Sequence, residues 1–178
     1  MTAGVDWTLR EASPDADGDA VAALMVEYMT WAHGRLRDEF DVYDPPADPA
    51  LVRSSLQTYR RPDGVILLAE HAGRGVAVGA LRRLEDGVVE IKRMYVIPEA
   101  RSRHIGSAIL DRLIDEAQAI GARVLRLDTC RFMKDAQRLY GSRGFVERAP
   151  YEGTEIPLRL QQYWLFYERQ MEPQTSKA

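Results

Sequence analysis

The chain has 178 residues, of which 46% are hydrophobic and 29% charged, a length and balance that suit one globular domain and exclude a disordered chain. Its net charge of −3 argues against a general nucleic-acid surface, and its lone cysteine, Cys130, excludes an internal disulfide. No apolar run approaches the roughly 20 residues that span a bilayer, and the N-terminus lacks the order of a signal peptide. We therefore expect a single cytoplasmic domain over residues 1–172, without membrane or nucleic-acid partners, and a frayed tail over residues 173–178.

The first part of the chain is expected to form a strand, two helices and an irregular connection. Trp7–Ala12 reads as a strand, and Asp19 is placed to cap a helix whose apolar residues recur at helical spacing from Ala20 to about Ala32. Three prolines block regular structure toward the end of His33–Pro49, so we expect that segment to be irregular. A second helix is expected over Ala50–Tyr59.

The middle of the chain is expected to form an antiparallel meander. A turn at Gly73–Gly75 and the dipeptide Asp86-Gly87, the strongest hairpin signal in the chain, join three β-rich runs. These strands are expected over Val65–His71, Val76–Leu84 and Val88–Ile97.

The second half alternates strands with helices. We expect, in order, a helix over Ile105–Ile120 ended by Gly121, a strand over Arg123–Thr129, a helix over Met133–Gly141, and strands over Phe145–Arg148 and Tyr163–Arg169. A strand–helix–strand passage returns the chain parallel to its first strand. The predicted fold is therefore mixed α/β, with a mostly antiparallel sheet of about six to seven strands flanked by helices.

The turn Arg101–Gly106 is the most informative segment, because it links a strand to the start of a periodic helix. The first N–H groups of a helix have no intrahelical partner, and together with the positive end of the helix dipole they suit a phosphate. Arg101 and Arg103 add positive charge beside them, and Gly106 and Ser107 leave room for a ligand. The segment predicts a site for a phosphate-bearing ligand.

Two motifs in order resemble those of the GNAT acyltransferases, a bacterial small-molecule-type member in particular. Arg101-x-x-His104-x-Gly106 stands where that family carries Gln/Arg-x-x-Gly-x-Gly/Ala, the turn that holds the coenzyme A pyrophosphate. Downstream, Ala136-x-x-Leu-Tyr140-x-x-x-Gly-Phe145 is similar to the family's second motif. The resemblance implies the fold expected above and an acetyl-CoA-dependent acyl transfer to an amine. Acetyl-CoA would contact Met94, Tyr95, Val96, Arg101, Ser102, Arg103, His104, Ile105, Gly106 and Ser107.

The sequence departs from the family pattern at two positions. His104 occupies the place of the first glycine, and its N–H remains usable if its backbone dihedrals are ordinary. Its imidazole faces either a phosphate or solvent. Met133 replaces the asparagine of the second motif, and we expect it to pack as a core residue at a helix start.

The resemblance also implies catalytic roles for two residues. Tyr140 would protonate the departing thiolate as general acid, a role compatible with simple packing against Phe145. Glu90 precedes Arg101 by eleven positions, where several family members place their general base. The equal alternative for Glu90 is an ion pair with Lys92 or Arg93. By the period of two, Glu90, Lys92, Met94 and Val96 are expected on one face, and Met94–Val96 would offer backbone groups to the acyl carrier.

The remaining candidates are weaker. Tyr28 and Tyr151 are candidate substrate-binding residues, with core packing as the alternative for each. Lys92 and Arg93 either attract an acidic substrate or pair with acids of the chain. An idle thiol is favoured over a nucleophile for Cys130, and the three histidines show no metal-ligand spacing, so no metal site is expected.

The sequence thus predicts an N-acetyltransferase that moves an acetyl group from acetyl-CoA to a primary amine of a small molecule or peptide by direct attack in a ternary complex. The alternatives are a non-catalytic acyl-CoA-binding or regulatory module and, last, an α/β protein with another phosphate ligand. Pairing of the aromatic strand Tyr163–Tyr167 across a homodimer is a further possibility. The acceptor and the acyl length stay open.

Overall fold

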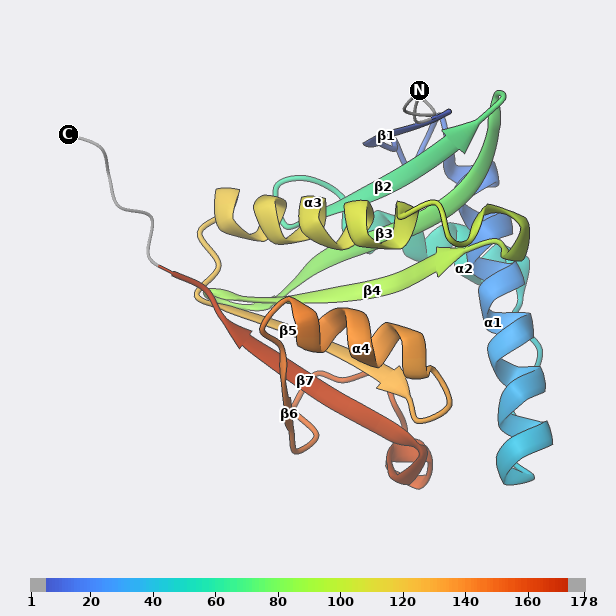
Figure 1. Cartoon of the computed structure of the whole chain (residues 1–178), viewed down its shortest axis with the longest axis vertical. Helices are drawn as coiled ribbons and strands as arrows, with labels where there is room; N and C mark the ends of the chain where they lie inside the picture. Colours follow the sequence, from blue (N-terminus) through green and yellow to red (C-terminus); the bar gives the residue numbers. More distant parts are fainter. Residues whose placement is uncertain (1–5, 173–178) are drawn as a thin grey trace.

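The computed structural model describes residues 6–172, which are built around one seven-stranded sheet (Figure 1). The strand order is β1-β2-β3-β4-β5-β7-β6, and β4 with β5 is the parallel pair among antiparallel neighbours. The strands are β1 Trp7–Glu11, β2 Gly64–His71, β3 Arg74–Glu85, β4 Val88–Val96, β5 Val124–Cys130, β6 Val146–Arg148 and β7 Trp164–Gln170. The mixed, mostly antiparallel sheet predicted from the sequence is confirmed.

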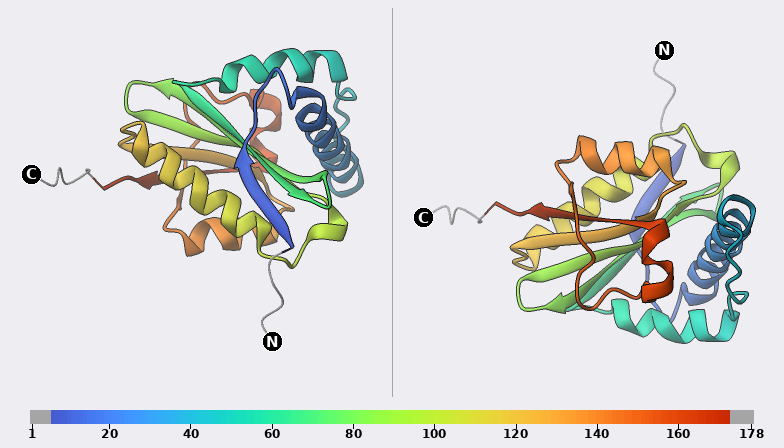
Figure 2. Two further views of the ribbon diagram at one scale, coloured as in Figure 1. Left: turned by 90° about the horizontal axis from the view of Figure 1, so that it is seen from above. Right: turned by 90° about the horizontal axis from the view of Figure 1, so that it is seen from below.

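Helices cover both faces of this sheet (Figure 2). The chain forms α1 Gly18–Phe40, α2 Pro49–Ser55, α3 Ile105–Ala119 and α4 Lys134–Ser142, with short 3-10 turns η1 Leu56–Tyr59, η2 Pro98–Ala100 and η3 Leu158–Tyr163. α1 and α2 lie on one face, and α3 and α4 on the other. Of the helices within residues 6–172, none combines the length and apolar character needed to cross a membrane. The predicted tail, residues 173–178, lies outside the described residues.

The meander β2-β3-β4 sits at the centre of the sheet, and α3 packs closely on it. Gly87 turns the chain between β3 and β4 with a φ of 71°, which glycine adopts without strain. Gly79 of β3 lies under α3, where an added Cβ would come within 2.4 Å of Ile109 Cγ2. The absent side chain therefore sets how near α3 approaches the strand from which the site opens.

The first helix is longer than predicted. α1 continues from Ala32 to Phe40, through a segment that the prolines suggested would be irregular. Leu36 is buried in the core, and an Arg35–Glu39 pair one turn apart supports the exposed side. The helix ends at Asp41, which adopts the left-handed conformation at φ 53°. The added turns bring more of α1 over the sheet than the sequence indicated.

A β-bulge in β4 overturns the expectation that Glu90, Lys92, Met94 and Val96 share one face. Lys92 is opposite Ala80 and Tyr95 is opposite Val78, so β4 carries one extra residue over that stretch. Arg93 within the bulge has a φ of 58°. Tyr95 therefore joins Glu90 and Lys92 on the α1 face, while Val96 lies on the α3 face with Ile91.

Strand β7 lies between β5 and β6, with both edges of Phe166–Glu168 already hydrogen-bonded. These residues have no free edge for pairing across a dimer. A homodimer formed elsewhere stays a prediction.

Candidate active site

An opening between β4 and β5 forms the centre of the site. The two parallel strands pair only from Val88–Val124 to Ile91–Leu127 within the described residues, and then separate. Two hollows meet at this opening. The inner cavity, about 290 Å³, is lined by parts of α1, β4, β5 and the segment before β7, and the α3 groove, about 370 Å³, runs past the start of α3. Both are lined by Tyr28, Met94, Met133, Ala136 and Tyr140.

The α3 groove brings together the predicted phosphate turn and the end of β4. Met94, Tyr95, Val96, Arg101 and Gly106 all line it. A Cβ added at Gly106 would lie 3.8 Å from Val96 Cγ2, an ordinary contact, so the protein itself has room for a side chain there. The absence of one leaves that space to the groove.

The turn before α3 is held in an unusual backbone conformation. His104, the residue before the helix, has φ 60° and ψ 14°, and Ser102 has φ 65°. The assumption of ordinary dihedrals at His104 is therefore wrong, because this position adopts the left-handed conformation that favours glycine. His104 makes no side-chain capping bond within residues 6–172. The first amides of α3 thus keep the anion-binding character expected of a helix start.

The two arginines of the turn differ in their contacts. Arg101 donates from Nε to the Val96 carbonyl at 3.2 Å, and its guanidinium lies 5.6 Å from the centre of the Trp31 ring, beside the groove. Arg103 instead forms an ion pair with Asp6 at 3.1 Å. Ile105 is buried in the core, so only its backbone is available to a ligand.

Tyr140 stands where the two hollows meet. It is 7% exposed, and its ring packs near Phe145 and Tyr167, at 6.1 and 6.2 Å between centroids. Burial, with smaller contributions from Tyr28 and Asp128, raises the pKa of Tyr140 well above its ordinary value. Its hydroxyl has no hydrogen-bond partner among residues 6–172. The group is therefore protonated at neutral pH and free to donate to a ligand.

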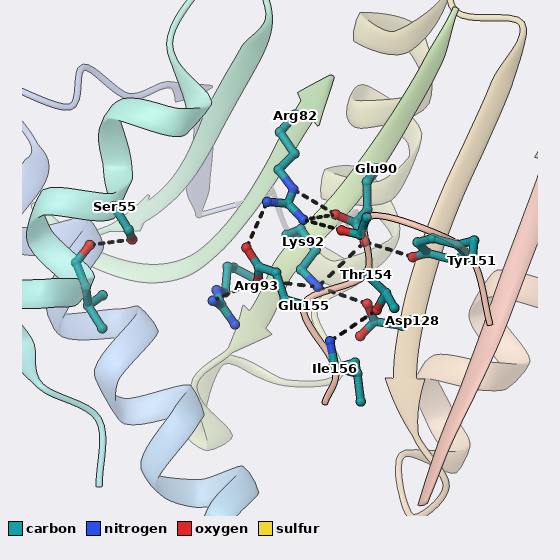
Figure 3. A network of polar contacts seen from close by, with 12 residues as sticks. Ser55, Arg82, Glu90, Lys92, Arg93, Asp128, Tyr151, Thr154, Glu155 and Ile156 are labelled. Carbon is teal, nitrogen blue, oxygen red and sulfur yellow. Dashed lines mark hydrogen bonds and ion pairs between the residues drawn. The ribbon is translucent and has the colours of Figure 1, made fainter. Parts of the chain in front are cut away.

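A cluster of six charged side chains lies beside the inner cavity (Figure 3). It comprises three cations and three anions: Arg82, Lys92 and Arg93 with Glu90, Asp128 and Glu155. Lys92 Nζ lies 2.9 Å from Asp128 and 3.7 Å from both Glu90 and Glu155. Burial acts to lower the pKa of Lys92, but the attraction of these carboxylates outweighs it, and the pKa is raised. Lys92 is therefore a permanent cation.

Glu90 is sealed inside this cluster. It is 0% exposed, Arg82 donates to one carboxylate oxygen at 2.7 Å, and the Tyr151 hydroxyl donates to the other at 2.8 Å. Neither Glu90 nor Tyr151 lines the inner cavity or the groove. The ring of Tyr151 instead faces the guanidinium groups of Arg126 and Arg148, at 5.2 and 5.6 Å. The structure thus brings the predicted base and the late-loop tyrosine together, behind the cavity wall.

Asp128 is the carboxylate that sequence reasoning missed. It follows Leu127, the last residue of β5 that pairs with β4; it lines the inner cavity, and its side chain is 8% exposed. Its place at the end of a strand parallel to β4 was a usable signal, because the carboxyl ends of parallel strands meet at one edge. Glu155 also lines the cavity, and burial raises its pKa less than Lys92, Arg93 and Arg82 lower it. It belongs to a loop without any pattern, so nothing in the sequence marked it.

The other candidates are placed as follows. Tyr28 lines both hollows, and its ring lies beside those of Trp31 and Tyr95. The Tyr95 hydroxyl donates to Glu27 of α1 at 2.9 Å. Met133 precedes α4 and lines both hollows, so the expectation of core packing is wrong.

Cys130 is buried, and burial raises the pKa of its thiol to about 11. A thiol with this pKa is protonated at neutral pH and a poor nucleophile.

Residues 26–145, more than half of the chain, match the family model described as the Acetyltransferase (GNAT) family. The chain belongs to the GNAT family. It is 40% identical over 97 residues to an IAA acetyltransferase of Azospirillum brasilense, and 34% identical over 107 residues to an uncharacterized N-acetyltransferase of Schizosaccharomyces pombe. These matches cover 54% and 57% of this chain and 63% and 64% of the relatives, so the similarity spans under two thirds of their length.

Solved structures described as acetyltransferases share the fold over almost all of the chain. An acetyltransferase of Streptococcus agalactiae superposes with a TM-score of 0.74 at 18% identity, covering 93% of this chain and 99% of that one. The acetyltransferase yncA of Salmonella typhimurium, solved with its cofactor acetyl-CoA, superposes with a TM-score of 0.68 at 21% identity, covering 97% and 98%. At these identities the likeness establishes the fold.

Proposed function

We propose that the protein transfers an acetyl group from acetyl-CoA to a primary amine, by direct attack within a ternary complex. The observation that carries this proposal is the meeting of the inner cavity and the α3 groove at Tyr140, in the opening between β4 and β5. One hollow suits the acyl donor and the other the acceptor, and reactants held together in this way need no covalent enzyme intermediate.

The residues present fit acetyl-CoA, which would supply the activated acetyl group. The backbone of Ser102–Ser107, with the dipole of α3, would hold the pyrophosphate, and Arg101 would add charge beside it. Beyond Ile91 the edge of β4 is unpaired with β5 within residues 6–172, so Met94–Val96 can offer backbone groups to the pantetheine arm and to the acetyl carbonyl.

We place proton transfers on two side chains from opposite sides of the opening. Tyr140 keeps its proton because burial raises its pKa, and it would donate that proton to the leaving thiolate. Asp128 lines the cavity and would accept a proton from the substrate ammonium, directly or through water, which frees the amine lone pair for attack on the thioester. Glu90, the base expected from the family spacing, does not line the cavity and would instead position Lys92 and Arg82 through its ion pairs.

The proposal is tested by thiol release from acetyl-CoA in the presence of a chemically diverse amine panel. We expect steady turnover with at least one class of primary amine, and a higher melting temperature with coenzyme A bound. His104 in a glycine conformation favours one alternative, a non-catalytic acyl-CoA-binding module. That alternative predicts the thermal shift without thiol release. Absence of both the shift and protection of the Ser102–Ser107 amides from exchange would exclude the whole proposal.

A further inference from the structure

We propose that the acceptor is a primary amine that also carries a carboxylate, such as an amino acid with a compact apolar side chain, and that Arg93 binds this carboxylate. The inference rests on the proposed function and names its substrate class. It is drawn from the charges, contacts and walls of the inner cavity.

The charge of the cavity favours a ligand of zero net charge. The buried cluster holds three cations and three anions, so it offers no excess of either sign to a polycation or to a simple anion. Asp44 also lines the cavity, and its charge is balanced from outside the lining by Arg159, at 2.9 Å. A zwitterion preserves this balance, because it adds one charge of each sign.

Arg93 is the cation of the cluster with donors to spare. The bulge in β4 turns it to the same side as Lys92, and the one hydrogen bond of its side chain within residues 6–172 is a long one to Glu155, 3.4 Å. Its side chain is 26% exposed and it lines the inner cavity. Among the described residues, His33 Nδ1 is the one buried side-chain nitrogen or oxygen without a partner, so the unbonded nitrogens of Arg93 reach solvent.

A guanidinium with free N–H groups is well suited to a carboxylate, which it can bind through two parallel hydrogen bonds. Lys92 is not equivalent, since its ammonium is already held between Asp128, Glu90 and Glu155. Asp128 accepts from Lys92 through Oδ2, and its Oδ1, which has no hydrogen bond within the described residues, would receive the amine. The two cavity groups left for a ligand are therefore one cation and one carboxylate, which matches an amino acid.

Beside His33, Asp44 and Thr129, the remaining walls of the cavity are largely apolar. They are formed by Met29 and Leu36 of α1 and by Ile156, Pro157, Leu160 and Trp164 of the late segment. A cavity of about 290 Å³ is at the lower end of the range for small-molecule sites. These walls suit a short aliphatic or aromatic side chain, and exclude a large glycoside or a folded peptide segment.

The first test needs no variant. Thiol release is measured with L-leucine, L-methionine and L-phenylalanine, each beside the amine that lacks the carboxylate (3-methylbutylamine, 3-(methylthio)propylamine, 2-phenylethylamine) and beside its amide. We expect kcat/KM for the amino acid to exceed that for both analogues by about 10- to 100-fold, the effect of hydrogen bonds to a charged group. Spermidine, a polycation, is expected to be the poorest substrate.

The second test assigns the preference to Arg93. Arg93→Gln is expected to raise KM for L-leucine by about 10- to 100-fold and to bring the ratio of leucine to 3-methylbutylamine near unity, with Arg93→Lys between the two. Arg83→Gln is the matched control, because Arg83 pairs with Asp63 at 2.8 Å on β3 and lines neither hollow. Calorimetric binding of L-leucine to the protein saturated with coenzyme A gives the same comparison without turnover.

The outcomes separate this inference from the proposed function. Equal rates for amino acids and their decarboxylated amines, or an Arg93→Gln enzyme with the wild-type ratio, would overturn the inference while leaving acetyl transfer intact. No thiol release with any amine, together with no coenzyme A binding, would remove the proposed function itself. If Arg93→Gln fails to fold, the comparison of substrates with the wild-type protein decides alone.

Discussion

Replacing Tyr140 with phenylalanine tests the site at the point where its two hollows meet. The substitution removes the hydroxyl and keeps the ring, which packs near Phe145 and Tyr167. The hydroxyl has no partner among residues 6–172, so its removal leaves no group unpaired. Stability should therefore stay nearly the same, because a hydroxyl without a hydrogen-bond partner in the protein contributes little to the fold.

The expected loss is confined to catalysis. A positioned general acid contributes about 100- to 10,000-fold in rate, which corresponds to about 3 to 5 kcal/mol of transition-state stabilisation. We expect Tyr140→Phe to lower kcat within that range and to change the affinity for coenzyme A little. Burial raises the pKa of Tyr140, so its proton is present across the neutral range and lost only as pH rises through the raised value. The ratio of wild-type to variant rate should thus be flat through neutral pH.

The assay is thiol release under saturating acetyl-CoA, with thermal unfolding measured on the same samples. Tyr167→Phe is the matched control, since Tyr167 is buried to a similar degree, lies beside Tyr140 and lines neither hollow. A wild-type kcat in Tyr140→Phe would refute the assignment. So would a loss of similar size in Tyr167→Phe, because that would point to packing rather than to the hydroxyl.

Four further predictions follow from single residues. His104→Gly should be about 1 kcal/mol more stable than His104→Ala in urea unfolding, because φ 60° strains any residue with a Cβ; equal stabilities would contradict this. Asp128→Asn and Glu90→Gln should both lower the free energy of unfolding, by about 3 to 5 kcal/mol, because each breaks a buried ion pair, but Asp128→Asn alone should also lower kcat/KM, by about 100- to 10,000-fold. The reverse pattern would return the base to Glu90. For Glu116, burial acts to raise the pKa, but hydrogen bonds from two arginines outweigh it, so the pKa is lowered. The stability that this carboxylate provides is present above its ordinary pKa of 4.5 and is lost as pH falls through the lowered pKa. Glu116→Gln should therefore make the free energy of unfolding depend less steeply on pH in the acid range. Cys130 should resist thiol reagents at neutral pH, with fast labelling as the contrary result.

Local patterns were enough to predict most of the fold. Period-two runs and the Asp86-Gly87 turn located β3 and β4, and the apolar stripe located α3, because each pattern is set by burial of one face. The end of α1 was predicted near Ala32 but lies at Phe40, because prolines show only where a helix cannot continue and do not locate an end that comes before them. The helix ends at Asp41, which has the left-handed backbone conformation; aspartate adopts this conformation only at some positions, so the residue type alone does not predict it.

For a related reason, the sequence predicted the acyl-donor side of the site but not the acceptor side. The phosphate-binding part of the donor side is a continuous segment of the chain, because one turn supplies both the amides and the charge for a phosphate. The acceptor side is assembled from α1, β5 and a loop after residue 150, which meet only in three dimensions. Asp128 and Glu155 are separated by 27 positions along the chain, yet both lie within 3.7 Å of one ammonium group, Lys92 Nζ. No local pattern encodes that meeting.

The bulge at Arg93 links these two halves. Without the bulge, regular alternation through Arg93 would point Tyr95 toward α3 and Met94 toward α1, reversing the walls of the two hollows. With it, Glu90 and Lys92 support the acceptor side while Val96 faces the groove beside Gly106. Deletion of Arg93 would remove the bulge and still keep Tyr95 and Val96 on their present faces, so coenzyme A should still bind at the start of α3 while the preference for a carboxylate is lost. A deletion of Arg93 that also abolished coenzyme A binding would show that the bulge is needed for the fold itself.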